Sequence, residues 1–173
     1  TPTNAVWSPV GADTNTTYDL DSAANATAGV NINLTGSDSS TDTVNIIGTA
    51  NVTKICSKYN IKIVYFSTCY VYPGISGNYK EEDAILPINN YAWSKLGGEC
   101  SIQMYKNSLI LRLSMTEKPF IHKEAFVDFK TNFIFHDEVA KILIKLLPRK
   151  GIINVGGESQ SVYQFAIKEN KEV

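Results

Sequence analysis

The sequence predicts an α/β fold in which helices cover a small parallel β-sheet. Two observations support this class. The run Ile61–Ser67 is almost continuously apolar, which is typical of a strand buried on both faces of a parallel sheet. Between Val52 and Tyr59, apolar side chains recur at intervals of three and four residues, which is the spacing of a one-sided helix. Helices and strands that alternate in this way imply right-handed βαβ units.

The next elements follow this first helix and strand in order. Asn60 separates the helix from the strand, and the prolines and glycines of residues 69–90 predict a loop. A helix is expected from about Tyr91 to Tyr105. A second buried strand is expected at Leu109–Leu113, which is again largely apolar.

The last part of the chain predicts one more helix and one more strand. Apolar residues from Val139 to Leu147 have helical spacing, and Pro148 predicts the end of that helix. Gly151–Gly156 is expected to form a short third strand. A partial parallel sheet with flanking helices is therefore the expected folded unit.

Charge and composition divide the chain near residue 43. Residues 1–43 hold five of the 17 acidic residues and none of the 16 lysines and arginines. They are rich in Thr, Asn, Asp and Gly, with too few large apolar groups to offset their ordering entropy by burial. We therefore expect a weakly β or disordered segment at 1–43, in which Gly29–Leu34 could pair as a strand, and a folded unit at 44–173.

The overall composition argues against several classes of protein. A formal net charge of −1 and a pI near 6.1 disfavour nucleic-acid binding through phosphates. No apolar run approaches the roughly 18 residues that span a bilayer, and no signal-peptide pattern opens the chain. Three cysteines without a C-x-x-C pair predict neither a disulfide framework nor a metal site, so we expect a reducing, cytoplasmic location.

Tyr91 and Lys95 are the first candidates for chemistry. Four residues apart in the predicted helix, a phenol and an ammonium lie on one face. A Tyr hydroxyl with its ordinary pKa of roughly 10 is a poor acid or base at neutral pH, and a neighbouring cation lowers that pKa. The pair could serve acid–base catalysis; the alternative is a Tyr at a helix start beside a solvated Lys.

The segment around this pair resembles the active-site helix of the extended short-chain dehydrogenases/reductases. Residues 86–99, Leu-Pro-Ile-Asn-Asn-Tyr-Ala-Trp-Ser-Lys-Leu-Gly-Gly-Glu, are most similar to the dTDP-4-dehydrorhamnose reductases and NAD-dependent nucleotide-sugar epimerases. Residues 66–74 resemble the strand-end motif of that family, and residues 111–114 and 133–140 resemble its later landmarks. The matches occur in family order over about residues 44–165.

The resemblance implies a Rossmann-like sheet, an NAD(P) cofactor and a set of roles. Tyr91 would protonate a sugar ketone as hydride arrives, and Lys95 would lower the Tyr91 pKa and bind the nicotinamide ribose. Thr68 would hydrogen-bond the reacting oxygen, with Ser67 as the alternate candidate. Ser67, Tyr91 and Lys95 would contact the cofactor. Both strand-end hydroxyls could instead cap backbone groups.

Three further polar residues are expected to have structural places. Arg112 interrupts an apolar run and is expected to form an ion pair rather than to bind substrate. His136 is expected at a helix start rather than as a ligand or base, and His122 is expected to be exposed. The loop from Gly74 to Asn90 is expected to lie over the substrate side.

The sequence departs from the family pattern at its N-terminal side. The family opens on a glycine-rich turn that approaches the cofactor pyrophosphate, and no Gly-x-Gly occurs in these 173 residues. Residues 1–43 occupy that place instead, and from Thr17 to Thr43 they resemble small β-modules of phage virion and tail-fibre proteins. The expectation is a phage-like segment joined to the C-terminal part of a sugar reductase.

These observations favour NAD(P)-dependent reduction or epimerisation of a nucleotide sugar by a truncated or fused form. Whether the isolated chain turns over substrate is left open. The alternatives are an inactive remnant that keeps the second half of the fold and a virion-associated structural protein. A nucleotide sugar, and a homo-oligomer or a complementing chain, are the expected partners, with neither nucleic acid nor membrane.

Overall fold

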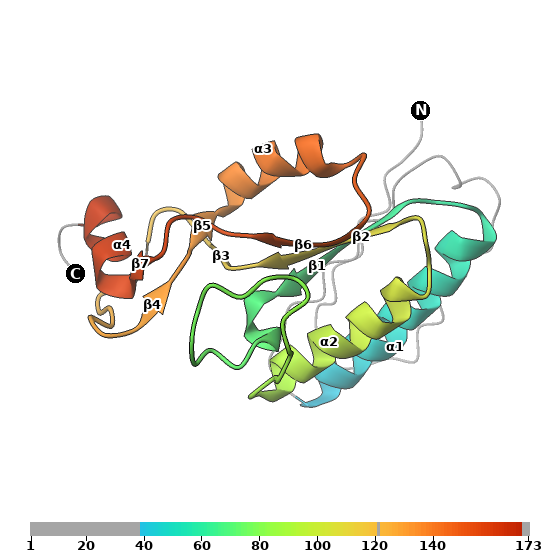
Figure 1. The fold of residues 1–173 in the computed structure, drawn as a ribbon, viewed down its shortest axis with the longest axis horizontal. Coiled ribbons are helices and arrows are strands. Elements are labelled where there is room, and N and C mark those ends of the chain that lie inside the picture. Colours follow the sequence, from blue (N-terminus) through green and yellow to red (C-terminus); the bar gives the residue numbers. More distant parts are fainter. Residues whose placement is uncertain (1–38, 121, 171–173) are drawn as a thin grey trace.

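The computed structural model describes residues 39–120 and 122–170 (Figure 1). The strand suggested at Gly29–Leu34, and all but the last five residues of the segment 1–43, lie outside the described residues. The elements, in chain order, are α1 (Ser39–Lys58), β1 (Ile63–Thr68), the 3-10 helix η2 (Cys69–Val71), α2 (Asn90–Gln103), β2 (Ser108–Leu113), β3 (Met115–Thr116), β4 (Lys130–Thr131), β5 (Ile134–Phe135), α3 (His136–Leu146), β6 (Gly151–Val155), β7 (Gln160–Ser161) and α4 (Val162–Glu169).

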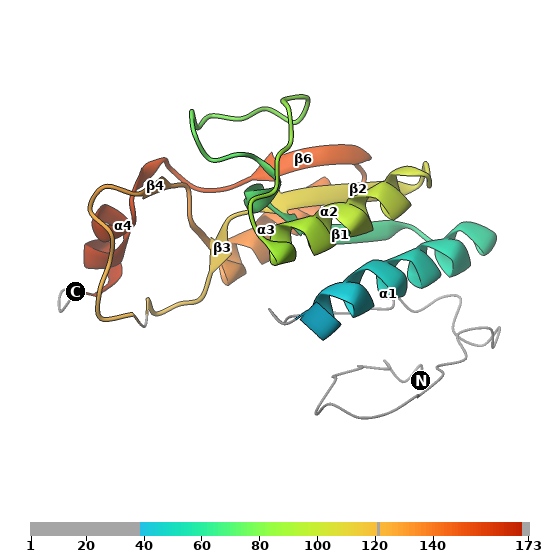
Figure 2. The ribbon, with the colours of Figure 1, turned by 90° about the horizontal axis from the view of Figure 1, so that it is seen from below.

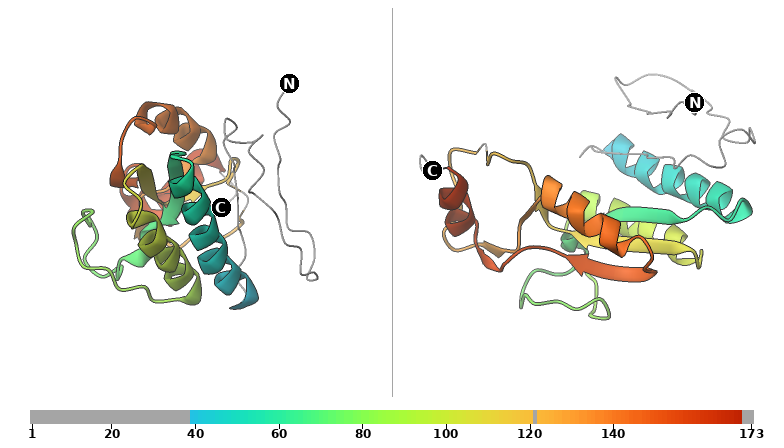
Figure 3. Two further views of the ribbon diagram at one scale, coloured as in Figure 1. Left: turned by 90° about the vertical axis from the view of Figure 1, so that its right-hand side faces the viewer. Right: turned by 90° about the horizontal axis from the view of Figure 1, so that it is seen from above.

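Three of these strands form the parallel sheet that the sequence predicts. Their order is β1-β2-β6, with Ile63 opposite Ser108 and Leu109 opposite Gly151. Helix α3 covers one face of this sheet, and α1 and α2 cover the other (Figures 1 and 3). The predicted α/β class is therefore confirmed, and the three strands lie at their predicted positions with ends that differ by a residue or two.

Strand β2 is buried along its whole length because helices cover both of its faces. Leu109 and Leu111 pack in one cluster with Val139 of α3. Ile110, whose side chain points the opposite way, packs in a second cluster with Ile102 of α2. This double coverage explains why the strand is a continuous apolar run rather than an alternating one.

The ends of the first two helices follow from local chemistry. Helix α1 begins at Ser39, ahead of the predicted division near residue 43, and Asn60 takes a left-handed φ of 55° between α1 and β1. Asn is one of the few residues that adopt this conformation readily. Helix α2 begins after Asn89, whose side chain accepts a hydrogen bond from the Ala92 backbone N–H at 2.8 Å.

The sequence analysis missed the smaller elements near the C-terminal end. Strands β3 and β5 pair in parallel, β4 and β7 pair antiparallel, and α4 packs Phe165 against Phe120 and Phe135. Figure 2 shows β4 and α4 grouped at one end of the molecule, away from α1. Two-residue strands have no period to detect, whereas α4 carries a recognisable capping box between Ser161 and Gln164.

Two further observations concern the described residues only. No helix in residues 39–120 and 122–170 is long and apolar enough to cross a bilayer. In the same ranges, no three His, Cys, Asp or Glu side chains gather as a metal site, and Cys56, Cys69 and Cys100 are free thiols.

Helices α1 and α2 approach closely because α2 carries two consecutive glycines. A Cβ atom on Gly97 would lie 2.9 Å from Ile46 Cγ1, and one on Gly98 would overlap the Tyr65 hydroxyl. Tyr65 fills this gap between β1 and α2, and its hydroxyl donates a hydrogen bond to the Lys95 carbonyl at 3.2 Å. The glycine pair therefore sets the distance between the helix and the strand that carry the candidate site residues.

We expect Gly98→Ala to lower the free energy of unfolding by about 1–3 kcal/mol, because the added methyl group must displace the Tyr65 ring. Urea unfolding followed by circular dichroism measures this change. Cys100→Ala, at an exposed position on the same helix, is the matched control and is expected to stay within about 0.5 kcal/mol. Equal effects of the two variants would contradict the close packing at Gly98.

Candidate active site

The residues that the sequence singled out meet where β1 ends beside the first turn of α2. Thr68 is the last residue of β1, and Tyr91 lies directly after the start of α2. The Thr68 hydroxyl hydrogen-bonds the Tyr91 side chain. Lys95 follows Tyr91 by one helical turn, so a hydroxyl, a phenol and an ammonium share one edge of the sheet.

Thr68 has two roles in this arrangement. It is buried, and its hydroxyl oxygen accepts a hydrogen bond from the Tyr70 backbone N–H at 3.2 Å, which caps the short helix η2. Thr68 therefore does cap a backbone group, and the same side chain also lies beside Tyr91. The backbone bond restricts the rotation of the hydroxyl that meets the phenol.

The expected lowering of the Tyr91 pKa by Lys95 is wrong for this structure. Burial raises the pKa of Tyr91, nearby Cys69 and Tyr70 raise it further, and the hydrogen bond with Thr68 opposes them. The Lys95 ammonium lies over the Tyr65 ring, 4.4 Å from the ring centroid. Tyr91 therefore stays a protonated phenol at neutral pH, which is the form that donates a proton.

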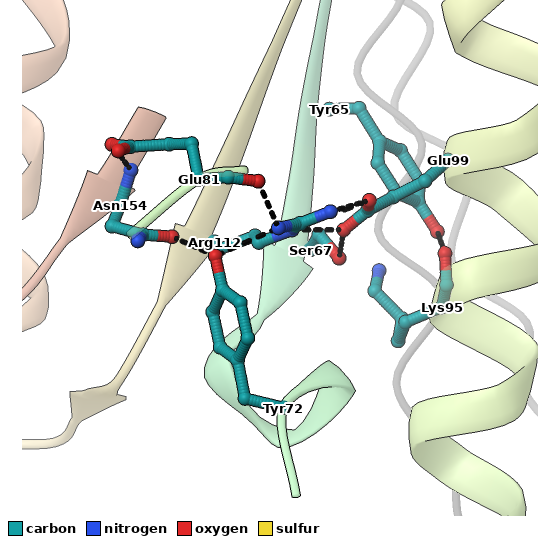
Figure 4. Close-up of polar contacts among 8 residues, drawn as sticks. All are labelled: Tyr65, Ser67, Tyr72, Glu81, Lys95, Glu99, Arg112 and Asn154. Atoms are coloured by element: carbon teal, nitrogen blue, oxygen red, sulfur yellow. Dashed lines mark hydrogen bonds and ion pairs between the residues drawn. The ribbon is translucent and has the colours of Figure 1, made fainter. Parts of the chain in front are cut away.

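Lys95 is a half-buried cation with an unusual environment (Figure 4). Burial lowers its pKa to about 8, and the negative charge of Glu99 acts in the opposite direction. Within the described part of the chain, its ammonium has the Tyr65 ring as a partner but no hydrogen-bond acceptor. A charged donor without an acceptor is costly to bury, so this ammonium is available to a ligand oxygen.

Arg112 forms a buried ion pair with Glu99 beside this edge, and Ser67 contacts the same carboxylate. Arg112 and Glu99 are 3% and 0% exposed, and Arg112 Nη2 lies 2.8 Å from Glu99 Oε2. Ser67 donates its hydroxyl hydrogen to Glu99 Oε1. The ion pair predicted for Arg112 is confirmed. The sequence did not predict that Glu99 is its partner.

The ion pair continues into a network that sequence reasoning missed (Figure 4). Arg112 Nη1 donates to the Tyr72 hydroxyl at 2.7 Å, and that hydroxyl donates to Asn154 Oδ1 at 2.9 Å. Glu81 accepts from the Asn154 backbone N–H at 2.8 Å, and Tyr79 stacks on Tyr72 with ring centroids 4.9 Å apart. These contacts fasten the loop between η2 and α2 to the carboxyl ends of β2 and β6.

An open cavity of about 850 Å³ lies on the C-terminal side of the site. Its lining combines aromatic rings with charged side chains and includes Tyr70, which is close enough to raise the Tyr91 pKa. His122 lies on its wall, exposed as predicted, with its ring 5.3 Å from that of Phe120. His136 begins α3, also as predicted.

Tyr91 and Lys95, one turn apart at the carboxyl edge of a parallel sheet, have the arrangement that the resemblance to the extended short-chain dehydrogenase/reductase class implies. The chain belongs to the RmlD substrate binding domain family, which matches residues 25–133. The family match begins at residue 25, whereas the resemblance in the sequence begins at about residue 44. It includes part of the segment likened to phage modules, and no comparison supports that likeness.

Named relatives agree with this family. A dTDP-4-dehydrorhamnose reductase of Aggregatibacter actinomycetemcomitans is 32% identical over 119 residues, which are 68% of this chain and 35% of that protein. A probable low-salt glycan biosynthesis reductase of Haloferax volcanii is 34% identical over 102 residues, 56% of this chain and 33% of that protein. The chain thus spans about a third of the length of each of these two relatives.

Solved structures show the same fold. The crystal structure of a hypothetical dTDP-4-dehydrorhamnose reductase from Sulfolobus tokodaii has a TM-score of 0.68 and 30% identity, covering 77% of this chain and 54% of that one. A dTDP-4-dehydrorhamnose reductase from Bacillus anthracis, in complex with NADP, has a TM-score of 0.68 at 24% identity, covering 76% and 54%.

One described side chain at this edge could hold part of a nicotinamide cofactor. The Lys95 ammonium has no hydrogen-bond acceptor among the described residues, although it is half-buried at the carboxyl edge of a parallel sheet. A ribose hydroxyl has the acceptor oxygen that this group needs. The Lys95 ammonium therefore fits an oxygen-bearing group, of which a ribose hydroxyl is one example.

We expect Arg112→Ala to lower the free energy of unfolding by about 3–5 kcal/mol, because it leaves the Glu99 carboxylate buried and unpaired. Thermal and urea unfolding measure this loss. Asp137→Asn breaks the exposed pair with Lys141 on α3 and is expected to cost less than about 1 kcal/mol. A small effect of Arg112→Ala would mean that water reaches Glu99.

Proposed function

We propose that this chain provides the proton-donor site of a nicotinamide-dependent nucleotide-sugar reductase of the dTDP-4-dehydrorhamnose reductase type. The observation that carries the proposal is the meeting of Thr68, Tyr91 and Lys95 at the end of β1. The family membership and the two curated reductases support the same class of reaction. The substrate would be a nucleotide sugar with a ketone on its ring.

In this proposal each residue acts on one atom. Thr68 and Tyr91 donate hydrogen bonds to the ketone oxygen, and the Tyr91 phenol releases its proton to that oxygen as negative charge develops on it. Lys95 donates to a ribose hydroxyl. A bound reduced nicotinamide supplies the hydride. The phenol carries its proton at neutral pH, since burial raises the pKa of Tyr91 above its ordinary value.

Ser67 has a different place in the proposal from the one that the resemblance implied. Its hydroxyl is buried and already donates to Glu99, so we assign it to holding the strand end rather than to contact with the cofactor. Thr68, the next residue, is left as the hydroxyl that meets the substrate oxygen.

The cofactor contact is tested by isothermal titration of the full chain with NADPH and NADH. We expect saturable binding that weakens at least about tenfold in Lys95→Ala, because a hydrogen bond from a charged donor contributes about 1.5–3 kcal/mol. Lys141→Ala, an exposed lysine on the far face of the sheet, is the matched control and is expected to bind like the wild type. No saturation in the wild type would overturn the proposal.

The same titration carries a pH signature. The pKa of Lys95 is lowered to about 8, so the ammonium dominates below that pH and is lost above it. Affinity should therefore fall as the pH rises through 8, and this fall should be missing in Lys95→Ala.

Turnover tests the role of Tyr91. With a dTDP-4-dehydro sugar and NADPH, we expect Tyr91→Phe to lower kcat by about 100-fold or more while cofactor affinity stays within about twofold, because the ring remains and the proton donor is removed. Cofactor oxidation followed by absorbance measures the rate. Full activity in Tyr91→Phe would exclude this residue as the donor.

A further inference from the structure

Glu99 is a fully buried carboxylate on α2. It is 0% exposed, whereas the acidic residues of the loops and of α3 reach solvent. A buried carboxylate is tolerated only when its oxygens are well supplied with donors. The two donor side chains, Ser67 and Arg112, come from two different strands.

These donors join the three elements that build the site. Oε1 accepts from the Ser67 hydroxyl and from Arg112 Nε at 3.1 Å, and Oε2 accepts from Arg112 Nη2 at 2.8 Å. Ser67 precedes Thr68, the residue that meets Tyr91. Through this carboxylate the end of β1 is therefore tied to the same helix that carries Tyr91.

Glu99 also lies one helical turn after Lys95, and Figure 4 shows both side chains on the same side of α2. Its negative charge favours the ammonium form of Lys95 and opposes the effect of burial. The Tyr65 ring from β1 lies under this ammonium, Tyr91 precedes Lys95 by one turn of α2, and Arg112 from β2 lies on the far side of Glu99 (Figure 4). The positive charge of Arg112 opposes the effect of Glu99 on the Lys95 ammonium, but Glu99 lies between the two cations (Figure 4).

We propose that Glu99 is the positioning residue of this site: its carboxylate holds the end of β1 against α2 through Ser67 and places a negative charge one helical turn from the Lys95 ammonium. The catalytic meaning of this role rests on the proposed function. The role itself is a property of the chain without cofactor or substrate, so it can be measured separately.

The test is a titration of the Lys95 amine in the full chain. Lysine amines are labelled with a trace of acylating reagent across neutral and alkaline pH, and the labelled peptides are quantified by mass spectrometry. We expect a midpoint near 8 for Lys95 in the wild type, falling by about one pH unit in Glu99→Gln, because removing a nearby opposite charge disfavours the charged form. Asp137→Asn removes a carboxylate on α3 and is expected to leave the midpoint unchanged.

A purely structural role for Glu99 would not move this midpoint, so an unchanged midpoint in a folded Glu99→Gln variant overturns the proposal. Glu99→Gln leaves Arg112 buried without its partner, which could unfold the chain. The double variant Glu99→Gln with Arg112→Met removes both charges. Its midpoint is expected to fall less than in the single variant but to stay below the wild type, and a wild-type midpoint here also overturns the proposal.

The two proposals fail in distinguishable ways. A midpoint that falls in Glu99→Gln, in a chain that binds neither NADH nor NADPH, supports the positioning role and contradicts the proposed function. An unchanged midpoint in a chain that binds cofactor through Lys95 supports the proposed function and contradicts the positioning role of Glu99.

Discussion

The buried ion pair between Glu99 and Arg112 is the interaction on which the rest of the structure depends. Removing two charges from water costs several kcal/mol, so such a pair persists only when other groups satisfy both ions. Ser67 donates to the carboxylate, and Tyr72 accepts from the guanidinium. These partners come from α2, β1, β2 and the loop after η2. Each of these elements therefore has one position relative to the others, and that position decides where Thr68, Tyr91 and Lys95 meet.

The same burial sets the chemistry of the edge. Burial disfavours charge on any group, so it raises the pKa of Tyr91 and lowers that of Lys95. The two shifts favour a neutral phenol and a neutral amine. Glu99 breaks this symmetry because its negative charge favours the ammonium form of Lys95 and so opposes the effect of burial on the Lys95 pKa. The site can thus hold a neutral donor beside a cation, which suits proton release to an oxygen that gains negative charge.

The sequence predicted those parts of the fold and site that depend on neighbours along the chain. Strand β2 and helix α2 have local patterns, and Tyr91, Lys95 and Glu99 follow one another at four-residue intervals on α2. The Tyr72 contacts could not be foreseen because its partners Arg112 and Asn154 lie 40 and 82 residues away. Ser67 and Thr68 are adjacent and both carry hydroxyls. Only the packing of α2 against the strand end distinguishes them, by giving one to Glu99 and the other to Tyr91.

Proton and ligand binding at this edge are thermodynamically coupled. A ligand oxygen that accepts a hydrogen bond from Lys95 binds the ammonium form better than the neutral amine. Binding therefore raises the pKa of Lys95, by the logarithm of the ratio between the ligand's affinities for the two forms. Below pH 8 the ammonium is already present and the ligand gains the full interaction. Above pH 8 part of the binding free energy goes to protonating the amine. Glu99 reduces that cost in advance, because its charge has already favoured the ammonium. The buried pair that orders the fold therefore also sets the pH range in which the edge can bind an oxygen-rich ligand.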